Sequence, residues 1–265
     1  MSGHFTLRTP DRPASPPTPK PGAAAKYSFE DPAFFPMKMF TWHKELEAKS
    51  GIILEELEQF LKDMPVNFAP YFRPDLVNRP GVWQTLGLKL WGMGNNDIID
   101  YFPRTMEVLK CVPRVVSLSF NHLQANGEVR YHQGNTNGIA RFHLGLRVPE
   151  GDAFFEVNGE RRKWEEGKLL AFTDAHWHTA ANYTEKSRYI MLFDVVHDRF
   201  KEQEHYLCAR VAGDLCTQYY VGRSKFLSSL KGFWRGLARF LIYTALVPYF
   251  HFKLRTDPDI LGRFS

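Results

Sequence analysis

Apolar residues recur at a helical spacing in the first part of the sequence. Between Thr41 and Met64 they lie three or four positions apart among Lys and Glu, which predicts an amphipathic helix; they are Ile53, Leu54, Leu57, Phe60 and Leu61. Pro103 stands where the first turn of a further helix tolerates proline, just before the segment RTMEVLK. After Asp198 the spacing is helical again.

The middle of the sequence alternates instead with a period of two. From Val115 to Val196 polar and apolar positions alternate, and β-branched and aromatic residues are frequent, which indicates strands. Asn158-Gly159 between two such runs predicts a two-residue hairpin. No helical pattern interrupts the strands, so a parallel βαβ fold is disfavoured. We expect a mainly β protein with flanking helices (α+β), built on a jelly roll or β-sandwich.

Three segments differ in composition. Residues 1–30 are rich in proline and contain no apolar stretch of signal-peptide length, which predicts a flexible Pro-rich tail. Residues 31–200 are expected to form the jelly-roll domain with its N-terminal helices, and residues 201–265 a basic, aromatic-rich helical segment. The longest apolar run without Lys, Arg, Asp or Glu, Phe240 to Phe252, is shorter than the roughly 20 residues that span a bilayer. No transmembrane helix is therefore expected.

Overall composition excludes a fibrous or wholly disordered chain, because 44% of the residues are hydrophobic and 24% are charged. Three cysteines are too few for a disulfide framework or a zinc cage, so a reducing, cytoplasmic environment is expected. The net charge of +5 is mild. It is concentrated, however, because residues 216–255 hold seven basic residues, ten aromatic residues and no acidic residue.

Two interpretations of residues 216–255 stay open. The first is a helix pair that packs its Phe and Leu side chains on the sheet and turns Arg to water. The second is peripheral contact with an anionic membrane, which combines basic and aromatic residues on one helix. No nucleic-acid-binding motif accompanies the basic residues, so no nucleic acid partner is expected.

Candidate chemistry lies in the alternating region. On a regular strand Arg141 and His143 point to one face, and so do His176 and His178 on another strand. Arg188 lies on an otherwise apolar strand, where a buried guanidinium needs an anionic partner. Two imidazoles on one sandwich with an inward Arg are typical of a mononuclear iron site with a carboxylate-bearing co-substrate. Cupin-like binding proteins place histidines similarly without catalysis.

Three segments carry a resemblance to a known family. They are YHQGNTNGIARFHLGL (131–146), KWEEGKLLAFTDAHWH (163–178) and SRYIMLFDVVH (187–197). They resemble the aspartyl/asparaginyl β-hydroxylases, a family of Fe(II)- and 2-oxoglutarate-dependent dioxygenases, over about residues 102–200. The resemblance implies a double-stranded β-helix (jelly-roll) core and the use of Fe(II), 2-oxoglutarate and O2.

The resemblance also implies roles for individual residues. His132 and His178 would be the iron ligands and the catalytic centre. His143 and Arg188 would bind the carboxylates of 2-oxoglutarate. Arg141 would contact an acidic substrate.

Two positions depart from the expected pattern. Where the family uses a small hydroxyl residue for 2-oxoglutarate, this sequence has Asn121, and Ser119 on the same strand face is the candidate substitute. A facial triad would place a carboxylate two residues after His132, but Gly134 stands there. The resemblance implies that two histidines suffice and that water fills the vacant position. Asp174 is a weaker candidate for the missing carboxylate.

The leading hypothesis is therefore an Fe(II)/2-oxoglutarate-dependent dioxygenase that hydroxylates an anionic substrate, either an Asp- or Asn-like side chain of a peptide or a small molecule. A membrane-associated lipid acyl-chain hydroxylase of the same family and a non-catalytic jelly-roll binding module are the alternatives. For Asp194 and His197 a structural role is expected, for His176 a supporting or surface role, and for the turn Trp164 to Gly167 no chemical role.

Overall fold

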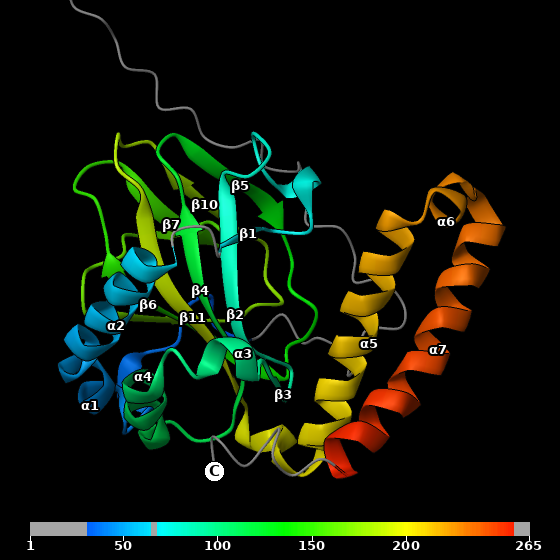
Figure 1. Ribbon diagram of the computed structural model, residues 1–265, viewed down its shortest axis with the longest axis horizontal. Helices are drawn as coiled ribbons and strands as arrows, with labels where there is room; N and C mark the ends of the chain where they lie inside the picture. The colour runs from blue at the N-terminus through cyan, green and yellow to red at the C-terminus, as the bar shows by residue number, and fades with distance from the viewer. Residues whose placement is uncertain (1–30, 65–67, 257–265) are drawn as a thin grey trace, which may run out of the picture.

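The computed structural model describes residues 31–64 and 68–256, so the predicted tail at 1–30 lies outside the described residues. Two β-sheets pack face to face, with helices on both sides of the sandwich (Figure 1). All pairings between the named strands are antiparallel. The predicted α+β jelly-roll fold is confirmed. The assignment of residues 31–200 and 201–265 to separate segments stays a prediction.

The larger sheet has the strand order β1-β2-β4-β11-β6-β9, with β3 paired to β2. Its strands are β1 (Ala69–Pro70), β2 (Trp83–Leu90), β3 (Met93–Gly94), β4 (Val115–Leu123), β6 (Ile139–Arg147), β9 (Leu169–Phe172) and β11 (Arg188–Val196). The smaller sheet has the order β5-β10-β7-β8. Its strands are β5 (Gly127–His132), β7 (Ala153–Val157), β8 (Glu160–Arg162) and β10 (His178–Asn182).

Short helices cover the outer face of the larger sheet. They are α1 (His43–Ala48), α2 (Ser50–Asp63), α3 (Asn96–Ile99) and α4 (Pro103–Val108). The 3-10 turns are η1 (Met37–Met39), η2 (Pro74–Leu76), η3 (Leu109–Cys111) and η4 (Asp198–Gln203), of which η2 contacts β5 of the smaller sheet. The helix predicted over residues 41–64 is interrupted at Lys49, whose backbone leaves the helical conformation. The buried carboxylate of Glu56 on α2 accepts hydrogen bonds from the backbone N–H groups of Arg104 and Thr105 and so caps the start of α4.

Alternation on β6 divides the core into two layers. Phe142 and Leu144 lie in the outer core under α1, α2 and α4, where Phe142 stacks on Phe193. His143, one residue along, points between the two sheets, where its ring contacts Phe155 and Phe172. The period of two seen in the sequence therefore separates apolar packing from the candidate chemistry.

The hairpin predicted at Asn158-Gly159 joins β7 to β8, and both residues have a positive φ, of 48° and 86°. This is the conformation that a type I′ turn requires, and Asn and Gly adopt it most readily.

Three helices at the C-terminal end form a hairpin beside the sandwich, on the side opposite α1 and α2 (Figure 1). They are α5 (Glu204–Arg223), α6 (Lys225–Ser229) and α7 (Gly232–Thr256). The inner face of α5 packs on sandwich residues from several strands and their connections: Trp91, Val116, Ile139 and Val196. The two long helices approach closely at Gly213, where a Cβ atom would lie 2.9 Å from Cγ2 of Val247. None of the helices in the described ranges is long and apolar enough to cross a bilayer.

Candidate metal and co-substrate site

His132 and His178 face each other across two neighbouring strands. His132 ends β5, His178 begins β10, and the two residues are direct partners in the strand pairing. Their ring centroids lie 4.1 Å apart. The sequence placed both histidines on strands, and the structure brings them together.

Both rings have the same tautomer. Nδ1 of His132 donates to the carbonyl of Arg130, and Nδ1 of His178 donates to the carbonyl of His176, each at 2.8 Å. Since Nδ1 carries the proton in each ring, Nε2 is left with its lone pair free, as a metal ligand requires. The pKa of each imidazole is lowered to about 3, by burial in both rings and, for His132, also by the adjacent His178. Both rings are therefore neutral at physiological pH.

A carboxylate stands beside this pair. Oδ1 of Asp174 lies 3.8 Å from Nε2 of His178, and the side chain is buried. Its Oδ2 has no hydrogen-bond partner within the described parts of the chain. A Cβ atom added to Gly134 would overlap the Asp174 carboxylate, and the Gly134 N–H donates to the carbonyl of Asp174 at 2.8 Å. Asp174 therefore fills the space that a side chain at position 134 would need.

Arg141 lies between two buried carboxylates. Its Nε and Nη2 donate to the two oxygens of Asp194, at 2.7 and 2.9 Å, and its Nη1 donates to Oδ1 of Asp174 at 2.5 Å. Asp194 is the direct partner of Arg141 in the pairing of β11 with β6. The structural role expected for Asp194 is thus the orientation of Arg141. Three of the five guanidinium N–H groups are used, which leaves two for another acceptor.

His143 presents the opposite tautomer to that of the two facing histidines. The indole N–H of Trp164 donates to Nδ1 of His143 at 3.2 Å. An indole can only donate, and burial with the nearby Arg188 lowers the pKa of His143 well below its usual value, so the neutral ring carries its proton on Nε2. His143 is therefore a hydrogen-bond donor at this point, whereas His132 and His178 offer lone pairs.

Arg188 is buried without an acidic partner among the described residues. Only 3% of the residue is exposed, and its Nε makes no hydrogen bond there. Its guanidinium lies 4.3 Å from the centre of the Trp164 ring, and burial lowers its pKa to about 9. A buried guanidinium is stable when an anion pairs with it. The structure thus contains a cationic position that suits a carboxylate.

Asn121 and Ser119 lie on β4 and are linked to each other. The Asn121 amide donates to Oγ of Ser119 at 2.8 Å and accepts from the indole of Trp83 at 2.9 Å. The ring of Trp83 is in turn 6.2 Å from that of His132. This polar chain lies near the histidine pair, and its proposed contact with 2-oxoglutarate stays a prediction.

Aromatic side chains close one side of the site. Phe155 and Phe172 each lie between 4.8 and 5.9 Å from the rings of both His143 and His178. They exclude water from that side, which strengthens polar interactions within the site.

No chemical role was expected for Trp164, which stands in the charged run RRKWEEGK, but its contacts with His143 and Arg188 make it part of the candidate site. The turn itself was predicted correctly, since Gly167 has a φ of +71°. The two other histidines of this region support the chain: His176 hydrogen-bonds the carbonyl of Asp31 at 2.7 Å, and His197 packs against Phe35.

No group of three or more His, Cys, Asp or Glu side chains within residues 31–64 and 68–256 is arranged to hold a metal ion. The candidate ligand set is therefore the two imidazoles, His132 and His178.

Comparisons with known proteins identify the family to which the chain belongs. The family model described as aspartyl/asparaginyl beta-hydroxylase matches residues 47–198. An ornithine lipid ester-linked acyl 2-hydroxylase of Rhizobium tropici is 29% identical over 171 residues, 63% of this chain and 61% of the relative. The human aspartyl/asparaginyl beta-hydroxylase is 28% identical over 61% of this chain and 22% of its own length.

A third relative, aspartate beta-hydroxylase domain-containing protein 2 of Xenopus tropicalis, is 42% identical over 57% of this chain and 43% of its own length. The chain thus matches less than two thirds of each of these relatives. Among solved structures, a cupin domain of a transcriptional regulator from Enterobacter cloacae is similar with a TM-score of 0.31 and 12% identity, over 44% of this chain and 98% of that domain.

Proposed function

Because the chain belongs to the aspartyl/asparaginyl β-hydroxylase family, we propose that it is an Fe(II)- and 2-oxoglutarate-dependent hydroxylase. The observation that supports this proposal best is the contrast between the histidines. Two of them, His132 and His178, have free Nε2 lone pairs on rings whose centroids lie 4.1 Å apart, and the third, His143, has an N–H near a buried Arg188 that lacks an acidic partner among the described residues. The first pair would suit a metal ion, and the second would suit a carboxylate next to it.

The residues fit both groups. Neutral imidazoles with Nδ1 held by backbone carbonyls are the usual nitrogen ligands of Fe(II). Bound iron would supply the activation of O2. The overall reaction would convert a substrate C–H, O2 and 2-oxoglutarate into C–OH, succinate and CO2.

The protein groups would orient the reactants. Arg188 would pair with the far carboxylate of 2-oxoglutarate, and His143 would donate to a carboxylate oxygen. The stacking of Arg188 on Trp164 holds the guanidinium in one orientation before the co-substrate arrives. The rings of Phe155 and Phe172 would keep water from the reacting atoms.

Arg141 is the proposed contact to an anionic substrate. Its two unused N–H groups would bind a substrate carboxylate or amide oxygen, while Asp194 and Asp174 hold the fork in place. Since the two carboxylates already compensate the guanidinium charge, this contact would select substrates by hydrogen-bond geometry more than by charge.

A second candidate function is the hydroxylation of a lipid acyl chain. It is favoured by the apolar, basic surface of the C-terminal hairpin, and one of the relatives is named as an acyl 2-hydroxylase of ornithine lipid. Assays of hydroxylation with acidic peptides and with lipids that carry acyl chains would distinguish the two candidates.

The decisive experiment has two parts. Anaerobic calorimetric titration of metal-free protein with Fe(II) should show one site, and aerobic incubation with Fe(II) and 2-oxoglutarate should yield succinate that increases with the correct substrate. His205→Ala, which removes a histidine on α5 outside the site, is the matched control and should behave as the unmodified protein. Absence of Fe(II) binding, or binding without any succinate, would favour the non-catalytic binding module instead.

A further inference from the structure

The outward face of α7 is apolar. Trp234, Leu241 and Phe252 are 64%, 56% and 69% exposed. They are spaced seven and eleven residues apart, so they lie on one face of the helix. The opposite face carries Phe250 and Leu254, which are buried in the core shared with α5. A helix face that contacts only water is normally polar, so this apolar face indicates a binding surface.

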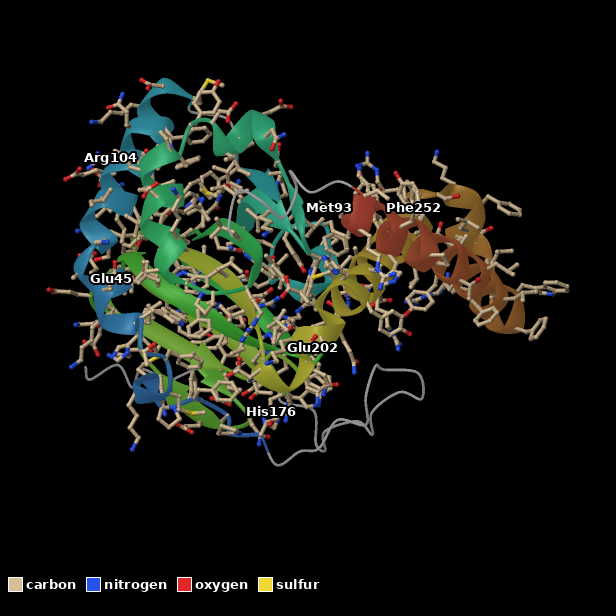
Figure 2. The ribbon with its side chains drawn as sticks, turned by 90° about the horizontal axis from the view of Figure 1, so that it is seen from below. Glu45, Met93, Arg104, His176, Glu202 and Phe252 are labelled. Atoms are coloured by element: carbon tan, nitrogen blue, oxygen red, sulfur yellow. The ribbon has the colours of Figure 1, made fainter. Side chains whose placement is uncertain are left out.

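The tip of the hairpin continues the apolar face. Phe226 on α6 and Phe233 at the start of α7 are among the most exposed apolar side chains of the described chain. Basic residues stand close to them in the sequence: Arg223, Lys225, Lys231, Arg235 and Arg239. Figure 2 shows the hairpin extending away from the sandwich, with Phe252 on its outer helix. We refer to α6 and the outward face of α7 as the hairpin surface.

The first of the two interpretations drawn from the sequence does not describe this region, because most of its large aromatic side chains do not pack on the sheet. A second copy of the chain would suit the apolar face but would oppose like charges, since residues 216–255 contain seven basic and no acidic residues. Exposed aromatic residues among uncompensated basic residues match a bilayer with anionic headgroups, into which Trp and Phe insert while Lys and Arg contact phosphates.

We propose that the hairpin surface docks the protein on an anionic lipid bilayer. The helices lie in the interface and do not cross it, consistent with the lack of a bilayer-spanning helix in residues 31–64 and 68–256. The aromatic side chains would be buried in the apolar part of the bilayer, and the basic side chains would be attracted to anionic headgroups. Binding is therefore expected only to bilayers that contain anionic lipids.

Contacts connect α5, the helix on which α7 packs, to the candidate site. From His132, a series of ring contacts passes to Trp83 and Tyr71, which stack at 3.8 Å. The next residue, Phe72, lies 6.5 Å from Tyr219 near the end of α5. In addition, Asn135, in the loop after His132, donates to Asp214 of α5 at 2.6 Å. Docking would therefore fix the position of the histidine site relative to the bilayer, because α5 links the two. This consequence rests on the proposed function, whereas the docking itself does not.

Vesicle cosedimentation tests the proposal. The protein should bind vesicles of phosphatidylcholine with phosphatidylglycerol at least about tenfold more tightly than vesicles of phosphatidylcholine alone, and added salt should weaken the binding. The variant Phe226→Ser/Phe233→Ser/Trp234→Ser and the variant Lys225→Glu/Lys231→Glu/Arg239→Glu should each lose at least about tenfold in affinity. All six side chains are exposed, so both variants should keep the thermal midpoint of the unmodified protein.

The matched control reverses the same number of charges elsewhere. Lys38, Lys44 and Lys62 are exposed on η1, α1 and α2, away from the hairpin. Lys38→Glu/Lys44→Glu/Lys62→Glu should leave most of the vesicle binding intact. Equal loss in the control and hairpin variants would reduce the effect to net charge and overturn the proposal.

Other outcomes also contradict it. Equal binding to both kinds of vesicle, no binding to either, or preferential binding of a DNA duplex would each overturn it. A dimer in sedimentation equilibrium that the aromatic variant abolishes, without vesicle binding, would assign the surface to a second copy. Vesicle binding is measured with metal-free protein, and hydroxylase activity is measured separately with Fe(II) and 2-oxoglutarate. Vesicle binding without hydroxylase activity would refute the proposed function alone. Hydroxylase activity without vesicle binding would refute docking alone.

Discussion

The carboxylate of Asp174 occupies the space in which a side chain at position 134 would begin. Gly134 is the position two residues after His132, where a facial triad would carry its carboxylate. A carboxylate is nevertheless present at this place, because the side chain of Asp174 reaches it from another loop. In this chain it is held by Arg141 and by burial.

The first prediction follows from this overlap. Gly134→Asp should destabilise the protein by about 1 to 3 kcal/mol, since the new side chain must displace Asp174. Gly134→Asp/Asp174→Gly should be less destabilised than the sum of the two single variants by about 1 kcal/mol or more, because the residues compete for one space. Urea unfolding of the four proteins measures this coupling. Strict additivity would contradict the overlap.

Loss of either facing histidine should remove the metal site. His132→Ala and His178→Ala should each abolish Fe(II) binding and succinate formation, because one remaining imidazole binds iron weakly. Anaerobic Fe(II) titration and succinate assay measure this, with His205→Ala as the control. If either variant kept the iron content of the unmodified protein, the ligand assignment would be wrong.

Arg188 should matter for the co-substrate. Arg188→Met should raise the apparent dissociation constant for 2-oxoglutarate by about one to two orders of magnitude, as expected for a charge-assisted contact worth about 1.5 to 3 kcal/mol. Because the replaced guanidinium is buried without an acidic partner, stability of the apo protein should not fall. Titration with 2-oxoglutarate and thermal melts together test both parts. A less stable variant with unchanged affinity would mean a structural role.

Replacement of Arg141, unlike that of Arg188, should lower the stability of the apo protein. Arg141→Met leaves Asp174 and Asp194 buried without their cation and should cost about 3 to 5 kcal/mol of unfolding free energy. Arg147→Met, on the same strand, removes an exposed pair with Glu58 and should cost less than about 1 kcal/mol. Comparable losses in the two variants would show that the buried ion pairs contribute little.

Acid should weaken the fold through His122. Its ring stacks on Tyr189 with centroids 4.4 Å apart, and burial lowers its pKa to about 4. The unfolded chain takes up this proton below its ordinary pKa of about 6.5, whereas the folded protein does so only near pH 4, so stability is present above pH 6.5 and is lost as pH falls. After discounting for partial exposure, the loss between pH 7.5 and 5 is about 1 kcal/mol. Urea unfolding of His122→Gln should show a shallower decline than the unmodified protein, while His205→Gln should not.

The faces on which side chains lie along each strand could be predicted from the sequence, because they depend on local backbone geometry. A period of two fixes which side chains share a face, so the placement of His143 opposite Phe142 and Leu144 followed from the sequence. Strand pairing is not local. The pairing of His132 with His178 depends on how β5 and β10 align, and the spacing of residues along the chain does not encode it.

Two features of the site lay beyond such reasoning. Trp164 stands among charged residues, in a turn for which no chemical role was expected. The packing of Arg188 on its ring makes it part of the site. Asp174 was a weaker candidate for the missing carboxylate from its spacing, but its overlap with position 134 arises where two loops meet, and that contact could not be predicted from the sequence.

The packing of α5 has a consequence for how the protein can be divided. The family match ends at residue 198, six residues before α5 begins. Leu207 of α5 nevertheless fills the space beside Gly138, and α5 covers Val116, Ile139 and Val196 of the sandwich. A chain cut where the family resemblance stops would expose this apolar face and free the loop that follows His132. The segment that matches the family model is thus shorter than the unit that packs around the site.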